Sequence, residues 1–289
     1  MNTPPRPFAR AESLLRTTFN EVKDRHGPEG HAYIRTHWRR YVHLIRRLPS
    51  IGESSTALEI GASILSNVLR RRFGAEVHTV HHELEPEWSK RYDPEGIHSY
   101  PCELTMKRLP VADNTFDVIL FDEVVEHLPV SPEFLLKQIV CKLKPDGQLL
   151  LSAPNFATSE KRLQLLTGRN PQDIMDDTFV YYAHHREPVM SECLRLVRSC
   201  GGTVLEREWS DFDVAPSPVA ATIHCLRHLR HGRIHRVIHQ LIPSTRSYLF
   251  VRAGRDPECR IGAQDGVPPL STTAEFRGTA QHKGAHGPS

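Results

Sequence analysis

Apolar residues recur along the chain in two alternating patterns. Short continuous apolar runs bounded by glycine or polar residues predict buried strands, and longer segments with helical apolar spacing predict amphipathic helices. The predicted strands are 56–62, 75–82, 97–104, 116–122, 148–155, 203–210 and 246–254. The predicted helices are 11–25, 33–48, 63–74, 132–143 and 186–202, with HGPEGH (26–31) between the first two, a Gly74 C-cap on the third and a KPDG turn at 144–147.

Alternation of strands with helices of this length is typical of βαβ units and a parallel sheet. Ligands of such sheets bind at the carboxyl ends of the strands. Gly61, Glu83, Asp122 and Asn155 fall at or just beyond predicted strand ends. We therefore expect these four residues to rim one crevice.

Composition and charge place the chain among ordinary globular proteins. The hydrophobic fraction is 39%, and a formal net charge of +3 is too small to indicate nucleic acid binding. Six cysteines form no C-x-x-C pair, which favours buried thiols in a reducing compartment. No apolar run is long enough for a membrane span, so we expect a cytoplasmic protein.

The composition also divides the chain into segments. Residues 1–10 are proline-rich and expected to be flexible, 11–50 form an N-terminal helical cap, and 55–255 form the main domain. From 258 to 289 the chain is rich in Gly, Pro, Ser and Thr and is predicted to be disordered.

The stretch LPVADNTFDVILFDEVVEHL (109–128), with LEIGAS before it and LKPDGQLLLSAPN after it, closely resembles the class I S-adenosylmethionine-dependent methyltransferases. The resemblance covers about residues 55–255. It implies an α/β fold with a Rossmann-like, doubly wound, mostly parallel seven-stranded sheet and helices on both faces. TGRNPQD and HHREPVMSECLRLVRSCGG resemble a bacterial subgroup similar to methyltransferases of sugar and polysaccharide biosynthesis.

The resemblance also implies a binding site for S-adenosylmethionine on particular residues. These are Glu59, Gly61 and Ala62 against the methionine moiety, Glu103 and Leu104 near the adenine, and Asp122 and Glu123 at the pocket edge. The family usually ends strand 2 with an acidic residue that holds the ribose, whereas here His81 and His82 stand there and Glu83 follows. Either Glu83 reaches back, or the ribose is held differently, or the domain is a non-catalytic relative.

The segment FDEVVEHL (121–128) carries Glu123, Glu126 and His127 at i, i+3 and i+4, a spacing that would place all three on one helix face. Together with His184 or His185 they resemble the metal site of methyltransferases acting on RNA 3′-terminal 2′-hydroxyls. A Mg²⁺ or another divalent ion there would lower the pKa of a substrate hydroxyl. Without metal, His127 or His184 is a candidate general base, with Glu123 as a third catalytic candidate. The alternative is that Glu123 and His127 only shape the cofactor pocket and that Glu126 is solvated.

The segment HCLRHLRHGRIHRVIHQL (224–241) lies in a predicted insertion at 210–242 and places five histidines on one helical face. A metal-binding stripe is disfavoured, because no Cys, Asp or Glu joins the histidines on that face. The alternatives are a structural helix, a basic face over the active site, and a basic face that contacts an anionic membrane or a polyanionic substrate.

The predicted function is S-adenosylmethionine-dependent O-methylation of a sugar or small-metabolite hydroxyl, without nucleic acid as partner. The alternatives are a metal-dependent RNA-terminal 2′-O-methyltransferase and a non-catalytic binding protein.

Overall fold

The structure is a computed structural model that describes residues 7–82, 92–105, 107–172, 184–211 and 242–257. Its strands are β1 Thr56–Ile60, β2 Glu76–His81, β3 His98–Pro101, β4 Phe116–Asp122, β5 Leu143–Pro154, β6 Gly202–Ser210 and β7 Tyr248–Arg255. Its helices are α1 Phe8–Val22, α2 Pro28–Thr36, α3 Trp38–Arg47, α4 Ile64–Phe73, α6 Glu133–Lys142, α7 Ser159–Leu166 and α9 Met190–Ser199. Four short 3-10 turns join them: η1 Lys23–Arg25, η2 Asp93–Glu95, η3 Val125–His127 and η4 Pro243–Thr245.

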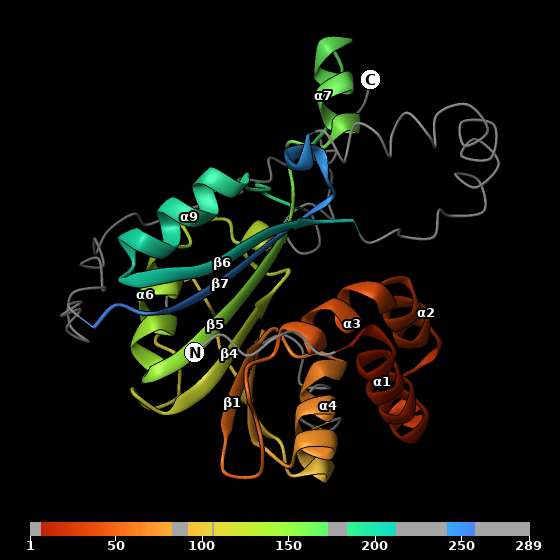
Figure 1. Cartoon of the computed structure of the whole chain (residues 1–289), viewed down its shortest axis with the longest axis vertical. Helices are drawn as coiled ribbons and strands as arrows, with labels where there is room; N and C mark the ends of the chain where they lie inside the picture. The colour runs from red at the N-terminus through yellow and green to blue at the C-terminus, as the bar shows by residue number, and fades with distance from the viewer. Residues whose placement is uncertain (1–6, 83–91, 106, 173–183, 212–241, 258–289) are drawn as a thin grey trace, which may run out of the picture.

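The seven strands form one sheet in the order β3-β2-β1-β4-β5-β7-β6 (Figure 1). β1 to β5 pair in parallel, and β7 is antiparallel to both β5 and β6. This confirms the predicted doubly wound, mostly parallel seven-stranded sheet with helices on both faces.

Alternate residues of the central strands supply two separate hydrophobic cores, as strand geometry requires. In β1, Ala57 packs with α1, α3 and α4, whereas Leu58 packs on the opposite face with α6 and α9. The N-terminal helices and α4 therefore share one core, seen to the right of the sheet in Figure 1. The N-terminal helices therefore pack against the sheet through a shared hydrophobic core.

The boundaries of the N-terminal helices differ from the prediction. HGPEGH interrupts the helices as predicted, at His26 and Gly27, but α2 already begins within it at Pro28, a position where the missing N–H of proline is no loss. The predicted helix 33–48 is divided at His37 into α2 and α3. The predicted KPDG turn lies within the span of β5, where the pairing register with β4 shifts.

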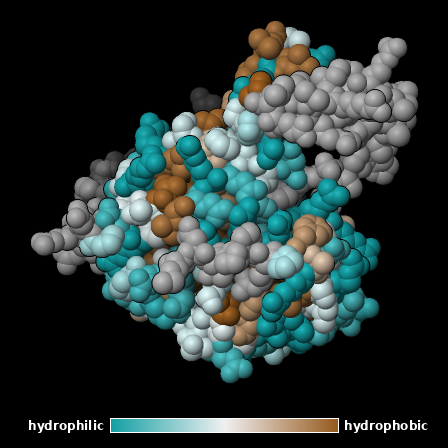
Figure 2. All heavy atoms as spheres, in the orientation of Figure 1, coloured by the Kyte–Doolittle hydropathy of each residue, from teal (hydrophilic) through white to brown (hydrophobic). Residues whose placement is uncertain are grey.

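Helix α7 was not predicted, and its leucines are exposed. Leu163, Leu165 and Leu166 have exposed fractions of 61%, 52% and 84%. The brown patch at the top of Figure 2 lies over α7, beside atoms drawn in grey. Among the described residues, no helix has both the length and the apolar character needed to cross a membrane.

Candidate active site

The carboxyl ends of β1, β4 and β5 meet at one edge of the sheet. Ile60 pairs with Phe121, and Asp122 pairs with Ser152, so the three strands end at similar heights. Gly61 directly follows β1, and Asn155 directly follows β5. Gly61, Asp122 and Asn155 therefore lie at the same edge of the sheet, as a shared crevice would require. Glu83, the fourth residue predicted there, lies outside the described residues.

At the end of β1, Glu59 holds the turn that leads into α4. The hydroxyl groups of Ser63 and Ser66 both donate hydrogen bonds to its carboxylate, and the Ser66 amide donates at 3.1 Å. Ser63 is also the N-cap of α4, because its hydroxyl accepts from the Leu65 amide. Burial raises the pKa of Glu59 to about 7, although these hydrogen bonds lower it. Glu59 therefore holds the turn between β1 and α4 in place through these hydrogen bonds.

Gly61 is required by its backbone and by its neighbour. Its φ is +79°, a left-handed conformation, and its amide donates to the Val80 carbonyl at 2.8 Å. A Cβ at this position would come within 2.9 Å of the Val124 Cγ2 atom. The turn after β1 therefore lies directly against the turn after β4, and Ala62 beside it is buried.

The end of β4 contradicts one prediction. Glu123 has a φ of +53°, and only the three-residue turn η3 follows, so Glu123, Glu126 and His127 do not share a helix face. Leu128 precedes Pro129, which disfavours the helical conformation, and Leu128 is extended with ψ of 120°. The helix that the spacing assumed cannot continue through this residue.

Two carboxylates at the end of β4 share one hydroxyl donor. The Ser152 hydroxyl donates to Asp122 and lies 3.3 Å from Glu123 Oε1, and the Glu123 amide donates to the Ser152 carbonyl at 3.1 Å. Burial raises the pKa of Glu123 to about 7, which Arg40 opposes and the Asp122 charge reinforces.

Arg40 on α3 is the site residue that sequence reasoning missed. Its side chain is 3% exposed, with Nε 3.4 Å from Asp122 Oδ2 and Nη1 3.3 Å from Glu123 Oε2. The sequence held a signal, because Arg40 lies four residues before Leu44 and so falls on the apolar stripe of its helix. An arginine on a buried stripe needs an anionic partner.

A second group of side chains lies near Asp122 and Glu123, and it consists of Glu126, His127 and His184. The two imidazole rings lie 4.9 Å apart between centroids, and His127 Nε2 is 3.8 Å from Glu126 Oε1. The Arg186 amide donates to the Glu126 carbonyl at 3.2 Å, which fixes the chain after His184 against η3. The predicted pairing of His127 with the distant His184 is therefore present in the structure; His185 is not a member of this group.

Glu126 is the most unusual carboxyl of the site. It is fully buried, and among the described residues neither of its oxygens has a hydrogen-bond partner. Burial, followed by the charge of Glu123, raises its pKa well above the usual range. A buried carboxyl with unmet hydrogen-bonding capacity is a typical feature of a functional site.

His184 is oriented by a neighbouring carboxylate. Its Nδ1 atom lies 2.8 Å from Glu187 Oε1, and Lys161 also bonds to Glu187. Burial alone would raise the pKa of Glu187, but hydrogen bonds from His184 and Lys161 lower it overall. An Nδ1–H bond to Glu187 leaves Nε2 as the basic nitrogen of His184.

One ligand atom from each of Glu126, His127 and His184 falls within 4.8 Å of the others, so these three side chains can fit a divalent ion. Glu123, the fourth predicted ligand, is not in this group, because its carboxylate is engaged by Arg40 and Ser152.

The remaining predicted cofactor residues follow β3. Leu104 is buried, and Glu103 Oε1 accepts a hydrogen bond from the Thr105 amide at 2.9 Å. β2 ends at His81, which is 2% exposed. The histidine-rich segment 224–241 and the tail 258–289 lie outside the described residues.

Comparison with known proteins agrees with this arrangement. Residues 58–151 match the family model described as a methyltransferase domain. This stretch runs from β1 to β5 and includes Glu59, Gly61 and the complete FDEVVEHL segment. No curated protein matches the sequence.

One solved structure that includes a proposed methyltransferase shares the fold at low sequence identity. A chain of the complex between the Haloferax volcanii Trm112 methyltransferase activator and a proposed methyltransferase has a TM-score of 0.54 and 16% identity. The match covers 79% of this chain and 94% of that one. An S-adenosylmethionine-dependent methyltransferase from Mesorhizobium loti has a TM-score of 0.49 and 16% identity, with coverage of 76% and 98%.

Proposed function

We propose that this protein is an S-adenosylmethionine-dependent methyltransferase that methylates a hydroxyl group of a sugar or small metabolite. The observation that carries the proposal is the match of residues 58–151 to the methyltransferase-domain model, on a sheet whose strand ends bring Gly61, Asp122 and Asn155 to one edge. The bound cofactor supplies an electrophilic methyl group on a sulfonium centre. The residues proposed to hold it are Gly61, Ala62, Glu83, Glu103, Leu104, Asp122 and Glu123, with Glu59 bracing the turn between β1 and α4.

Methylation of a hydroxyl requires the removal of a proton as the new C–O bond forms. His127 and His184 are the proposed proton acceptors, since an imidazole has an ordinary pKa near neutrality. Glu187 orients the His184 ring, and the buried Glu126 lies beside His127. Beyond this step, the work of the site is alignment of the acceptor oxygen and exclusion of water.

A divalent ion is the second candidate for activating the acceptor. The observation in its favour is the close approach of ligand atoms from Glu126, His127 and His184. Such an ion would lower the pKa of the bound hydroxyl. With metal, an RNA 3′-terminal 2′-hydroxyl becomes a possible acceptor, as the FDEVVEHL resemblance implies.

The test is calorimetric titration of S-adenosylhomocysteine into the chelator-treated protein, with and without added Mg²⁺ or Mn²⁺. We expect saturable binding by the wild type and roughly 10–100-fold weaker binding by Asp122→Asn, the loss expected for one charged hydrogen bond. Asp117→Asn is the matched control, because Asp117 lies on the same strand away from its carboxyl end. Absence of binding by the folded wild type would leave the non-catalytic alternative.

A metal-dependent heat that disappears in a Glu126→Gln, His127→Ala variant would establish the ion as cofactor. Retention of a short RNA oligonucleotide at low salt would favour the RNA alternative over a sugar or small metabolite.

A further inference from the structure

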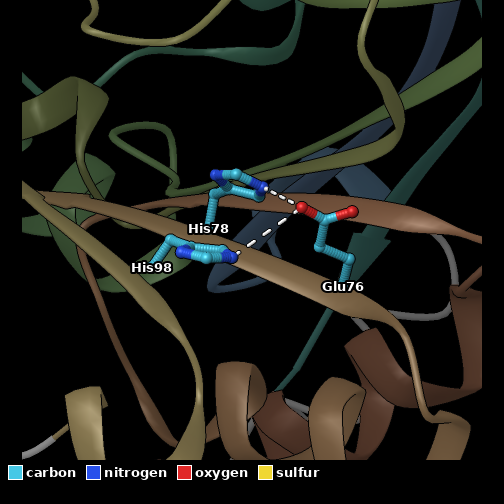
Figure 3. A group of neighbouring side chains, drawn as sticks. All are labelled: Glu76, His78 and His98. Carbon is cyan, nitrogen blue, oxygen red and sulfur yellow. Dashed lines mark hydrogen bonds and ion pairs between the residues drawn. The ribbon is translucent and has the colours of Figure 1, made fainter.

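Two histidines and a glutamate gather on one face of β2 and β3, away from the site described above. Glu76 and His78 are two residues apart on β2 and so point to the same side of the sheet. His98 is the parallel register partner of His78 on the neighbouring strand β3. Figure 3 shows the three side chains converging above the two strands.

The distances between their polar atoms suit a common ligand. Glu76 Oε1 lies 3.2 Å from His78 Nε2 and 3.8 Å from His98 Nε2, and all three ligand atoms fall within 4.8 Å of one another. In a tetrahedral zinc site with bonds of about 2.0–2.1 Å, ligand atoms are about 3.3 Å apart. Small side-chain rotations would therefore bring all three atoms into coordinating positions.

The surroundings of His78 also suit a metal ligand. Its Nδ1 atom lies 3.2 Å from the Tyr100 hydroxyl, and its ring stacks with Tyr100 and lies edge-on to Phe116. A hydrogen bond from Nδ1–H to the Tyr100 oxygen would leave the Nε2 lone pair for a metal ion. Burial lowers the pKa of His78, with opposition from Glu76, and this direction favours the neutral imidazole that binds metal ions.

This cluster is separate from the strand-end crevice. Glu76 is the first residue of β2, whereas the cofactor edge begins beyond His81, the last residue. Five residues of strand span about 16 Å. Glu76 instead pairs with Thr56 at the start of β1.

We propose that Glu76, His78 and His98 form a binding site for a divalent transition metal ion of the zinc class, with water completing its coordination. Two imidazoles and one carboxylate favour zinc and its neighbours over Mg²⁺ or Ca²⁺, which prefer oxygen ligands. β3 is a four-residue strand at the edge of the described sheet. The ion would join this edge strand to β2 and stabilise the chain that leads to Glu103 and Leu104.

The test is calorimetric titration of Zn²⁺ into the full-length, chelator-treated protein, with the stoichiometry compared between variants. Because the chain has 18 histidines, the decisive quantity is the change in stoichiometry upon substitution. We expect His98→Asn to lose one zinc equivalent, or at least 100-fold in affinity for it. The His98 side chain is 53% exposed, so the variant should fold normally, which circular dichroism would check.

Two further variants make the result specific. Tyr100→Phe should weaken this binding by about tenfold through loss of the partner of Nδ1. A His127→Asn, Glu126→Gln variant should retain the equivalent that His98→Asn loses. Equal zinc stoichiometry and affinity in the wild type and His98→Asn would overturn the proposal, as would the absence of zinc binding by the wild type. No cofactor is present in these titrations, so their outcome is independent of the proposed methyltransferase activity.

Zinc should also raise the melting temperature of the wild type but not of His98→Asn, since a ligand of the folded state alone stabilises it. Amide hydrogen exchange of residues 98–100 should slow in the wild type upon zinc addition. Unchanged exchange there, with zinc bound, would contradict the proposed link between β2 and β3.

Discussion

Arg40 on α3 and Asp122 at the end of β4 form an ion pair within the protein, with their side chains only 3% and 5% exposed. The same guanidinium approaches Glu123 and lies 3.5 Å from the Tyr33 hydroxyl. The N-terminal helices therefore contribute a charged group directly to the strand ends where the cofactor is proposed to bind. Any change at Arg40 should affect both the stability of the protein and its affinity for the cofactor.

Replacement of Arg40 by Met should lower the free energy of unfolding by about 3–5 kcal/mol, because it leaves buried carboxylates without their cation. Urea unfolding measures this loss. Arg39→Met, at the exposed neighbouring position, should change the unfolding free energy by less than about 0.5 kcal/mol. Equal effects of the two substitutions would show that the buried ion pair contributes no specific stability.

Replacement of Gly61 by Ala should destabilise the protein by about 2–4 kcal/mol, through its left-handed backbone and the close contact with Val124. Thermal unfolding compares it with Gly52→Ala, whose added Cβ meets no atom within 4 Å. A Gly61→Ala, Val124→Ala double variant should recover the part of the loss that is due to contact. If Val124→Ala gives no recovery, the backbone conformation alone explains the effect.

Glu59 should make stability depend on pH. The unfolded carboxyl releases its proton near pH 4.5, whereas the folded one keeps it to about pH 7. The contribution of Glu59 to the unfolding free energy therefore falls as the pH rises from about 4.5 to 7 and is constant above that range. A Glu59→Gln variant should lack this decline, which amounts to on the order of 3 kcal/mol.

The measurement is the difference in unfolding free energy between Glu59→Gln and the wild type from pH 4 to 8. The difference is needed because burial lowers the pKa of His37 to about 4 and of His43 to about 3. Those groups make stability rise with pH over the range where Glu59 makes it fall. Glu29→Gln, at an exposed position, controls for the loss of one carboxyl. A pH-independent difference would contradict the prediction.

Asn155 joins the end of β5 to the chain that enters β7. Its side-chain Nδ2 donates to the carbonyls of Ser244 and Arg246 at 2.9 and 2.7 Å. Its side-chain Oδ1 accepts from the Ala157 backbone amide at 3.0 Å. Asn155→Ala should lower the unfolding free energy by about 1–3 kcal/mol, because two partly buried carbonyls lose their donors. Asn155→Asp keeps the acceptor but not the donor, so similar losses in both variants would assign the effect to the two donated bonds.

The parts of the fold that sequence predicted best are those fixed by local chemistry. β4 was predicted with its observed bounds, because FDVILFD is a continuous apolar run between polar turns. Gly74 is the C-cap of α4, as predicted, and it has the left-handed conformation common at that position, with φ of +70°.

The parts that were missed depend on contacts between distant segments or on one residue of backbone geometry. The spacing of Glu123, Glu126 and His127 suggested a helix, but a left-handed Glu123 and the residue before Pro129 prevent one. The apolar stripe of α3 indicates that Arg40 is buried, but only the packing of α3 over the sheet shows that its partners are Asp122 and Glu123. Conversely, His184 was identified by resemblance alone, and the structure places it beside His127.

The position of β7 has a consequence for how the chain folds during synthesis. β7 is the last described strand, yet it lies inside the sheet between β5 and β6. Until residues 248–255 leave the ribosome, the backbone N–H and C=O groups of β5 that pair with β7 have no partner strand, and β6 lacks the strand that it pairs with. An unpaired strand edge is a template for association with other chains. The nascent protein should therefore depend on chaperones until β7 has been made, and truncation before residue 248 should yield aggregates.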